Sequence, residues 1–290
     1  MSTIKGFVLC ADDYAFTPGV SAGILQLLEA GRITATGAMT NRPDWPRAAP
    51  LLKAFDGGAD LGLHLNLTAG KPLAAMPQFA PDDALPALGL ILKQATLGRL
   101  PLGEIEAEID RQLQAFEQAM GRVPDFIDGH QHVHAVRGVR AMLLKVVAAR
   151  YPDAKPYIRN PAERATAILA RRVQTAKALL ITRIAGGLAR DLAVAGIASN
   201  QGFAGVSAFD PKQDYAEEFA RALVTPGERH LIMCHPGLID DELRASDPVT
   251  ETRPKELAFF LSPRFDEICA AAGMRAMRFR DLPVARGKRG

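Results

Sequence analysis

The sequence predicts an α/β protein, a TIM-like (β/α) barrel of seven or eight parallel strands. Short apolar stretches alternate with stretches of helical length along the 290 residues, and strands that alternate with helices pair in parallel. Seven or eight such units in about 280 residues fit a barrel. Several apolar stretches also end in ionisable residues, and the C-terminal strand ends of a barrel carry its active site. An open doubly wound sheet is the alternative.

The first predicted elements form a βαβ unit. An apolar strand over 6–11 precedes a helix from Pro18 to Gly31, because proline suits the first helical turn and glycine suits the end of a helix. A second strand is expected over 34–39.

The alternation continues to the C-terminus. Further strands are expected up to His64, through the histidine-rich segment 126–134, and over 156–159, 198–204, 231–234 and 274–279. Helices are expected over 44–55, 103–120 and 137–150, within 164–195, and over 214–224 and 255–272. Residues 68–102 are rich in proline and glycine and predict a long irregular connection at the active face, of the kind that covers a substrate. We expect a single domain over 1–285 and a disordered basic tail over 286–290.

Composition indicates an ordinary globular protein. The hydrophobic fraction is 48%, the charged fraction 23% and the net charge +3, with no basic stripe among aromatics, so no nucleic-acid partner is expected. The three cysteines form no CxxC pair, which argues against disulfides and a thiolate zinc site. The N-terminus lacks the pattern of a signal peptide, and no apolar run reaches about 18 residues. These features predict a cytoplasmic protein that does not insert in a membrane.

Ionisable side chains gather at the ends of four predicted strands. The strands end in Asp12 and Asp13, in His64, in the segment with Asp128, His130, His132 and His134, and in His235. If the histidine segment is extended, its alternation puts Asp128 and the three histidines on one side. His230 precedes the late strand and is expected at the surface.

A mixed set of carboxylates and imidazoles can hold a divalent cation that supports hydrolysis. Adjacent Asp12 and Asp13 point in different directions at a strand end, so one can bind the cation while the other takes a proton from water. The structural alternatives are a helix cap for the aspartates and a hydrogen-bonded wall residue for His64. Buried imidazoles on one side need polar partners, which favours a metal or catalytic role for the histidine run.

Three more residues are candidates for substrate binding or catalysis. Trp45 can stack on a sugar ring or pack in the core at a helix start. Arg159 can bind a substrate oxygen or form an ion pair. His235 can give a proton to a leaving amine from the side opposite the base.

These motifs together resemble the YdjC-like carbohydrate deacetylases. The similarity covers Ala11-Asp12-Asp13-Tyr14, Gly62-Leu63-His64-Leu65-Asn66-Leu67-Thr68, Asp128-Gly129-His130-Gln131-His132-Val133-His134 and Met233-Cys234-His235-Pro236-Gly237, in the right order along nearly the whole chain. The resemblance implies a TIM-like barrel that removes the N-acetyl group from chitin-derived sugars with a bound divalent cation. It favours Mg²⁺, with Zn²⁺ as the alternative.

The resemblance also implies a role for each residue. Asp12 would be the general base, and His235 would protonate the departing amine. The cation would be held by Asp13, His64 and His130. Asp128, His132 and His134 would face the substrate or support the ligands, and Asp128 could orient a ligand imidazole.

The expected partner is an N-acetylated mono- or oligosaccharide; the sequence does not give the oligomeric state, although a homodimer is common for such barrels. Two alternatives stay open. One is a metal-dependent hydrolase of another bond, a phosphoester or a lactam, although no glycine-rich phosphate loop is present. The other is a non-catalytic barrel that binds amino sugars around a structural metal.

Overall fold

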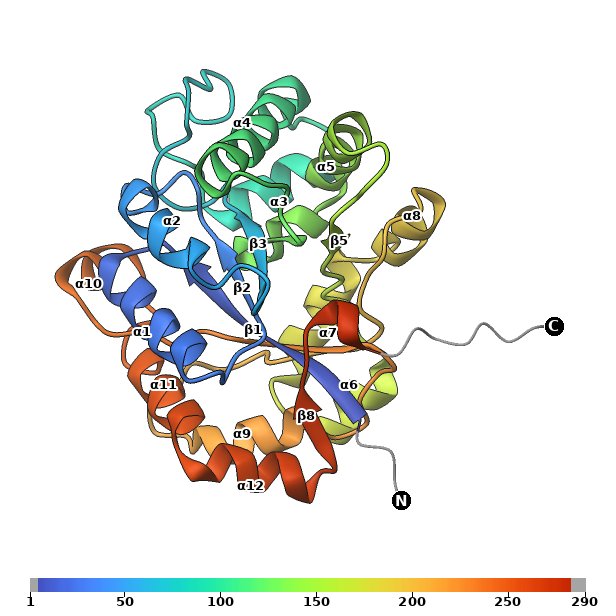
Figure 1. The fold of residues 1–290 in the computed structure, drawn as a ribbon. Helices are drawn as coiled ribbons and strands as arrows, with labels where there is room; N and C mark the ends of the chain where they lie inside the picture. The colour runs from blue at the N-terminus through green and yellow to red at the C-terminus, as the bar shows by residue number, and fades with distance from the viewer. Residues whose placement is uncertain (1–4, 283–290) are drawn as a thin grey trace.

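A curved sheet of parallel strands lies inside a layer of helices in the computed structural model, which describes residues 5–282 (Figure 1). The strands are β1 (Lys5–Tyr14), β2 (Ala35–Ala38), β3 (Asp60–Leu65), β4 (Phe126–Gly129), β5 (Tyr157–Ile158), β6 (Phe203–Ala204), β7 (His230–Cys234) and β8 (Met274–Ala276). Their order is β5-β4-β3-β2-β1-β7-β6, and β8 pairs with the start of β1. The predicted α/β barrel class is therefore confirmed.

The ring of strands stays open between β5 and β6, the two ends of the strand order. The chain just before β6 partly fills this opening. The backbone N–H of Ile158 donates to the carbonyl of Ala198 at 3.0 Å, and the N–H of Asn160 donates to the side chain of Asn200 at 2.7 Å. The barrel is thus incomplete, with irregular backbone in place of one strand ladder.

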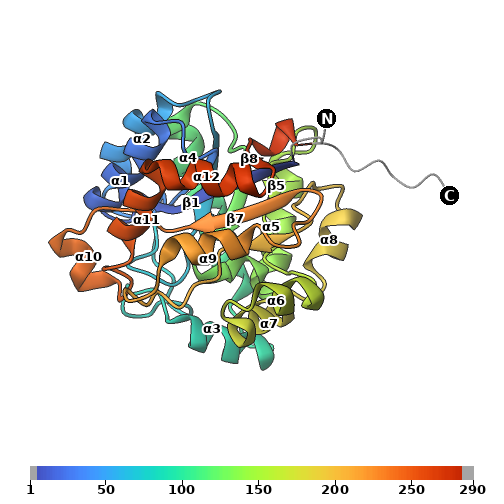
Figure 2. The ribbon, with the colours of Figure 1, turned by 90° about the horizontal axis from the view of Figure 1, so that it is seen from below.

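Helices cover the outer face of the sheet. They are α1 (Pro18–Glu29), α2 (Trp45–Lys53), α3 (Leu88–Thr96), α4 (Leu102–Met120), α5 (Arg137–Arg150), α6 (Ala165–Arg171), α7 (Thr175–Ile184), α8 (Leu188–Val194), α9 (Tyr215–Ala222), α10 (Asp241–Ser246), α11 (Arg253–Leu261) and α12 (Pro263–Ala271). Figure 2 shows α1, α11 and α12 in succession along one side. No helix within residues 5–282 combines the length and the apolarity that crossing a bilayer requires.

Strand β1 is buried on both faces. Phe7 and Leu9 pack with the outer helices, whereas Val8 and Cys10 belong to a second cluster on the other face of the strand, with Phe126. This alternation follows from the period of two in a strand, and burial on both faces is typical of parallel sheets under helices. β1 therefore gives a rigid base to the residues at its C-terminal end.

Most predicted elements are present, but the helices differ from the prediction at three places. The connection 68–102 contains α3, and α10 follows β7; neither helix was predicted. The helix predicted over 255–272 is two helices, α11 and α12. Ser262 is extended at ψ 157°, because the proline that follows it disfavours a helical conformation there.

The histidine-rich segment is not an extended strand, so that prediction was wrong. β4 ends at Gly129, and His130–Ala135 form the 3-10 turn η1. Gln131 (φ 53°) and His132 (φ 60°) are left-handed, which ends the alternation on which a shared side depended.

His230 is fully buried rather than at the surface, because it is the first residue of the buried strand β7. Its Nε2 hydrogen-bonds the carbonyl of Ala222 at 3.0 Å. Cys10, Cys234 and Cys269 are buried and free. The predicted basic tail, 286–290, lies outside the described residues.

Candidate metal centre and active site

The predicted site residues lie at the C-terminal ends of neighbouring strands. Asp12 and Asp13 end β1, His64 is in β3, Asp128 is in β4, Arg159 follows β5 and His235 follows β7. Parallel strands bring these ends to one edge of the sheet. Residues that are far apart in the sequence therefore meet, as the alternation of strands and helices predicted.

Both aspartates of β1 reach the same site because the strand is irregular where they lie. Asp13 has φ 72°, in the left-handed region, and the register of β1 with β2 shifts between Ala11 and Tyr14. In a regular strand neighbouring side chains would point to opposite faces. A left-handed residue other than glycine costs of order 1–3 kcal/mol and is typical of functional sites.

Asp13, His64 and His130 form an Asp-His-His cluster. Asp13 Oδ1 lies 2.9 Å from His130 Nδ1 and 3.3 Å from His64 Nε2, and the three candidate ligand atoms lie within 4.8 Å of one another. Metal bonds of about 2.0–2.1 Å in a tetrahedral site place ligand atoms about 3.3 Å apart. The observed spacing therefore fits a cation with one oxygen and two nitrogen ligands.

Asp128 orients His64 within this cluster. The two residues are paired across β3 and β4, and His64 Nδ1 lies 2.7 Å from Asp128 Oδ1, so Nε2 faces Asp13. Burial lowers the pKa of His64, but Asp128 and Asp13 outweigh it and raise this pKa to about 10. A cation that binds Nε2 must displace this proton.

Arg159 binds the carboxylate of Asp12, which lies outside the Asp-His-His cluster. Its Nη1 and Nη2 donate to Oδ2 and Oδ1 of Asp12, each at 2.6 Å, and Nη2 also lies 2.5 Å from Asp128 Oδ2. Burial alone would raise the pKa of Asp12, but the guanidinium holds it well below its ordinary value. Of the two interpretations of Arg159, the ion pair is the one observed, and its side chain is fully buried.

His235 lies beside Asp12, with its Nε2 4.0 Å from Asp12 Oδ2. Phe209 packs against the ring edge to face at 5.1 Å, and Glu256 accepts a hydrogen bond from the backbone N–H of His235 at 2.6 Å. Burial outweighs the two aspartates and lowers the pKa of His235 to about 4. The imidazole is therefore neutral at neutral pH.

His132 and His134 lie behind the site. His134 is fully buried and its Nε2 hydrogen-bonds the carbonyl of Arg159 at 2.8 Å, which fixes the backbone that presents the guanidinium. The ring of His132 packs edge to face on Phe203 at 5.5 Å. Burial lowers the pKa of both histidines, so both are neutral.

Trp45 belongs to the core, so of its two interpretations core packing at a helix start is the one observed. Its side chain is 4% exposed, stacks on Phe116 with ring centroids 6.0 Å apart, and donates through Nε1 to the carbonyl of Ala115 at 3.3 Å. Trp45 thus joins the start of α2 to α4.

Among the residues that sequence reasoning missed, Arg253 and Gly37 bear directly on the Asp-His-His cluster. Arg253 donates to Asp13 Oδ2 at 2.8 Å from a position 240 residues away. Gly37 of β2 leaves room for the His64–Asp128 pair, since a Cβ there would lie 3.0 Å from Asp128 Oδ1 and 3.1 Å from His64 Cβ. Neither residue carries a local sequence signal.

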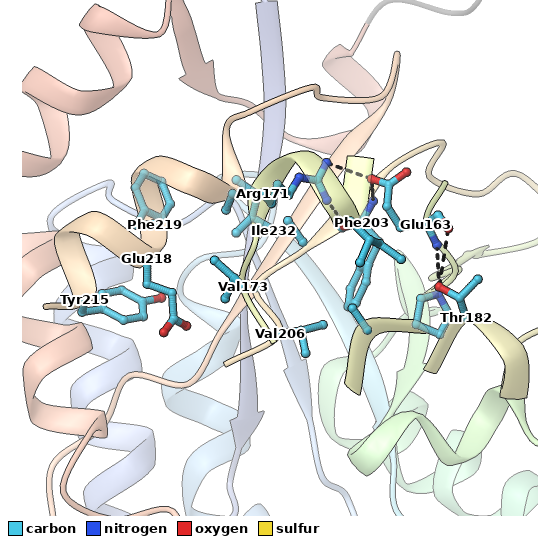
Figure 3. Close-up of a pocket in the computed structure, with 16 residues that line it drawn as sticks. Glu163, Arg171, Val173, Thr182, Phe203, Val206, Tyr215, Glu218, Phe219 and Ile232 are labelled. Carbon is cyan, nitrogen blue, oxygen red and sulfur yellow. Dashed lines mark hydrogen bonds and ion pairs between the residues drawn. The ribbon is translucent and has the colours of Figure 1, made fainter. Parts of the chain in front are cut away.

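A separate hollow lies beside β6, between α6 and α9 (Figure 3). Its walls include Val173, Val206 and Phe219, and Arg171 pairs with Glu163 at 2.9 Å on one side. None of Asp12, Asp13, His64, His130 and His235 lines this hollow.

The fold and the site define an α/β barrel protein with a candidate metal centre at its strand ends. The chain belongs to the YdjC-like protein family, whose model matches residues 6–271. A chitooligosaccharide deacetylase of Escherichia fergusonii is 33% identical over 248 residues, 82% of this chain and 84% of that protein. One of Yersinia pestis is 32% identical over 279 residues, 96% of this chain and 99% of that protein.

A solved structure from Enterococcus faecalis V583, proposed to be a cellobiose-phosphate cleavage protein, has the same fold. Its TM-score is 0.72 at 22% identity, and the match covers 97% of this chain and 99% of that one. At this identity the likeness concerns the fold alone.

Proposed function

We propose that the protein is a metal-dependent carbohydrate N-deacetylase that hydrolyses the acetamide of N-acetylated, chitin-derived sugars to acetate and a free amine. One observation carries this proposal: the Asp-His-His cluster lies beside a second carboxylate, Asp12, that is ionised and outside the cluster. The relatives named chitooligosaccharide deacetylases support the choice of substrate.

Asp12 is the proposed general base. Its two oxygens are held by Arg159, so the carboxylate is charged and fixed in orientation when it accepts a proton from the attacking water. A divalent cation held by Asp13, His64 and His130 would polarise the acetamide carbonyl and lower the pKa of that water. Asp12, the proposed base, and Asp13, the proposed metal ligand, are adjacent in sequence, so the backbone limits the distance between their carboxylates.

His235 is the proposed proton donor to the departing amine. It is neutral at neutral pH because its pKa is lowered to about 4. It must therefore gain a proton during the reaction before it can act as an acid. Asp12, 4.0 Å away, holds the proton taken from water at that stage and can supply it.

The donor set bears on the identity of the cation. The family resemblance favours Mg²⁺, which prefers oxygen ligands and retains several waters. Two imidazole nitrogens with one carboxylate oxygen are the ligands that Zn²⁺ prefers. We therefore propose a divalent cation of the Zn²⁺ type ahead of Mg²⁺, and elemental analysis of the purified protein decides between them.

The phosphoester alternative has less support in the structure. Arg159, the arginine that the sequence placed at a strand end, is taken up by Asp12 and Asp128. Its two terminal nitrogens are engaged by these carboxylates and its side chain is fully buried, so they are not available to hold a phosphate.

The test is acetate release from a panel of N-acetylated mono- and oligosaccharides, with and without a chelator. We expect acetate in amounts equal to the new amine, and its loss on chelation with recovery when metal is restored. Release of phosphate from sugar phosphates without acetate release would support the alternative hydrolase. Tight sugar binding without any product would support the non-catalytic barrel.

A further inference from the structure

Arg253 is a buried arginine in direct contact with a proposed metal ligand. It is the first residue of α11 and is 1% exposed. Its Nη2 donates to Asp13 Oδ2 and to Asp247 Oδ2, each at 2.8 Å, and its Nε donates to the carbonyl of Val249 at 2.8 Å. The guanidinium is therefore held by three partners, two of which are carboxylates.

This contact gives the two carboxylate oxygens of Asp13 different partners. Oδ1 faces His130 and His64, whereas Oδ2 is occupied by the guanidinium. A cation at the Asp-His-His cluster would meet one oxygen of this carboxylate, because the other is already hydrogen-bonded. The positive charge of Arg253 also offsets the negative charge of Asp13.

We propose that Arg253 is a positioning residue that makes Asp13 a one-oxygen metal ligand and so sets the preference of the site for imidazole-binding metals over oxygen-binding ones. This inference rests on the metal site of the proposed function. Metals that prefer oxygen gain from a carboxylate that binds through both oxygens and from uncompensated negative charge. Two imidazole ligands and one charge-balanced oxygen offer neither, and instead suit Zn²⁺ and Co²⁺.

A purely structural role is the competing explanation. Arg253 also ties the loop that contains Asp247 and Val249 to the start of α11. If that were its whole role, its replacement would lower stability and leave the relative affinities of two metals unchanged. The ratio of the Zn²⁺ and Mn²⁺ dissociation constants therefore separates the two explanations.

The experiment compares the full-length protein with Arg253→Gln, Arg253→Lys and Arg171→Gln. Arg171 is the matched control, since it is also a buried arginine paired with a carboxylate, Glu163, but lies outside the metal site. Zn²⁺ and Mn²⁺ dissociation constants are measured by competition titration, and each Co²⁺-loaded protein is examined by visible absorption.

Arg253→Gln should reduce the preference for Zn²⁺ over Mn²⁺ by about tenfold, a common effect for a residue that supports a ligand. Its Co²⁺ absorption should weaken as the coordination number rises. Arg253→Lys should restore most of the preference, because both bonds from Arg253 to the carboxylates come from a single nitrogen and one ammonium can supply them. Arg171→Gln should match the wild type in both measurements.

An unchanged metal ratio and an unchanged Co²⁺ spectrum in folded Arg253→Gln would overturn the inference and leave the proposed function standing. If that variant does not fold, Arg253→Gln/Asp247→Asn replaces it, since the second change removes the carboxylate that would lose its partner, and the same criteria apply. Failure of the wild type to bind Zn²⁺, Mn²⁺ or Co²⁺ would instead overturn the metal site itself.

Discussion

The guanidinium of Arg159 binds both oxygens of Asp12 from 147 residues away, with two bonds of 2.6 Å. This two-bond geometry is the strongest form of an arginine–carboxylate contact. It fixes the charge and the orientation of the proposed base without placing it on the metal.

Asp12→Asn should remove turnover and preserve metal binding. The amide keeps the shape of the side chain but cannot accept the proton of the attacking water, so acetate release should fall by about 10²–10⁴-fold. Zinc titration should show one site with nearly unchanged affinity. Equal loss of metal binding and turnover would instead place Asp12 among the ligands.

Arg159→Gln should shift the acidic limb of the rate profile to higher pH. Without the guanidinium, burial dominates and raises the pKa of Asp12, so the base is charged only at higher pH. The stability that wild-type Asp12 contributes is present above its unfolded pKa, near 3.9, and is lost as the pH falls through its lower folded value.

The measurement for Arg159→Gln is kcat/KM against pH. Arg171→Gln serves as the control for loss of a buried ion pair, which by itself costs about 3–5 kcal/mol. If the acidic limb stays in place and both variants lose similar stability, Arg159 has only a structural role and does not set the pKa of Asp12.

Metal binding should release about one proton from His64 at neutral pH. Its folded pKa is raised to about 10, so its stabilising contribution is present below the unfolded pKa, near 6.5, and is lost as the pH rises through about 10. Calorimetric titration of Zn²⁺ in two buffers with different ionisation enthalpies counts the protons. Asp128→Asn should reduce this count, because it removes the main group that raises the pKa of His64.

Gly37→Ala should weaken metal binding by roughly tenfold, because its methyl group would displace the His64–Asp128 pair. Gly103→Ala is the matched control, since a Cβ there meets nothing within 4 Å and alanine favours a helix. Zinc titration of both variants provides the comparison. Equal zinc affinity in the two variants would show that the His64–Asp128 pair tolerates the added methyl group.

Trp45→Ala should lower stability by about 3–5 kcal/mol and leave the KM for sugars unchanged in the folded protein. Trp45→Phe should recover much of this loss, because the ring can still stack on Phe116. Urea unfolding and steady-state kinetics give the two quantities. A large rise in KM with little change in stability would instead indicate that Trp45 contacts the substrate.

The sequence was sufficient to locate the site but not its detailed geometry. Apolar strands that run into Asp12, His64 and His235 predicted the shared edge of the sheet, because parallel strands bring like ends together. The left-handed conformations of Asp13 and His132 were not predictable, since residues other than glycine adopt them only when tertiary contacts compensate. The contact of Arg253 with Asp13 depends on the assembled fold and has no local pattern.

The opening between β5 and β6 lies away from the strands that carry the proposed metal ligands. The Asp-His-His cluster and its base come from β1, β3 and η1, and none of them from the stretch that carries α6, α7 and α8. That stretch can lengthen or shorten at modest entropic cost without moving a ligand atom. The 160–200 segment can therefore change in length and sequence while the proposed metal ligands and base stay in place.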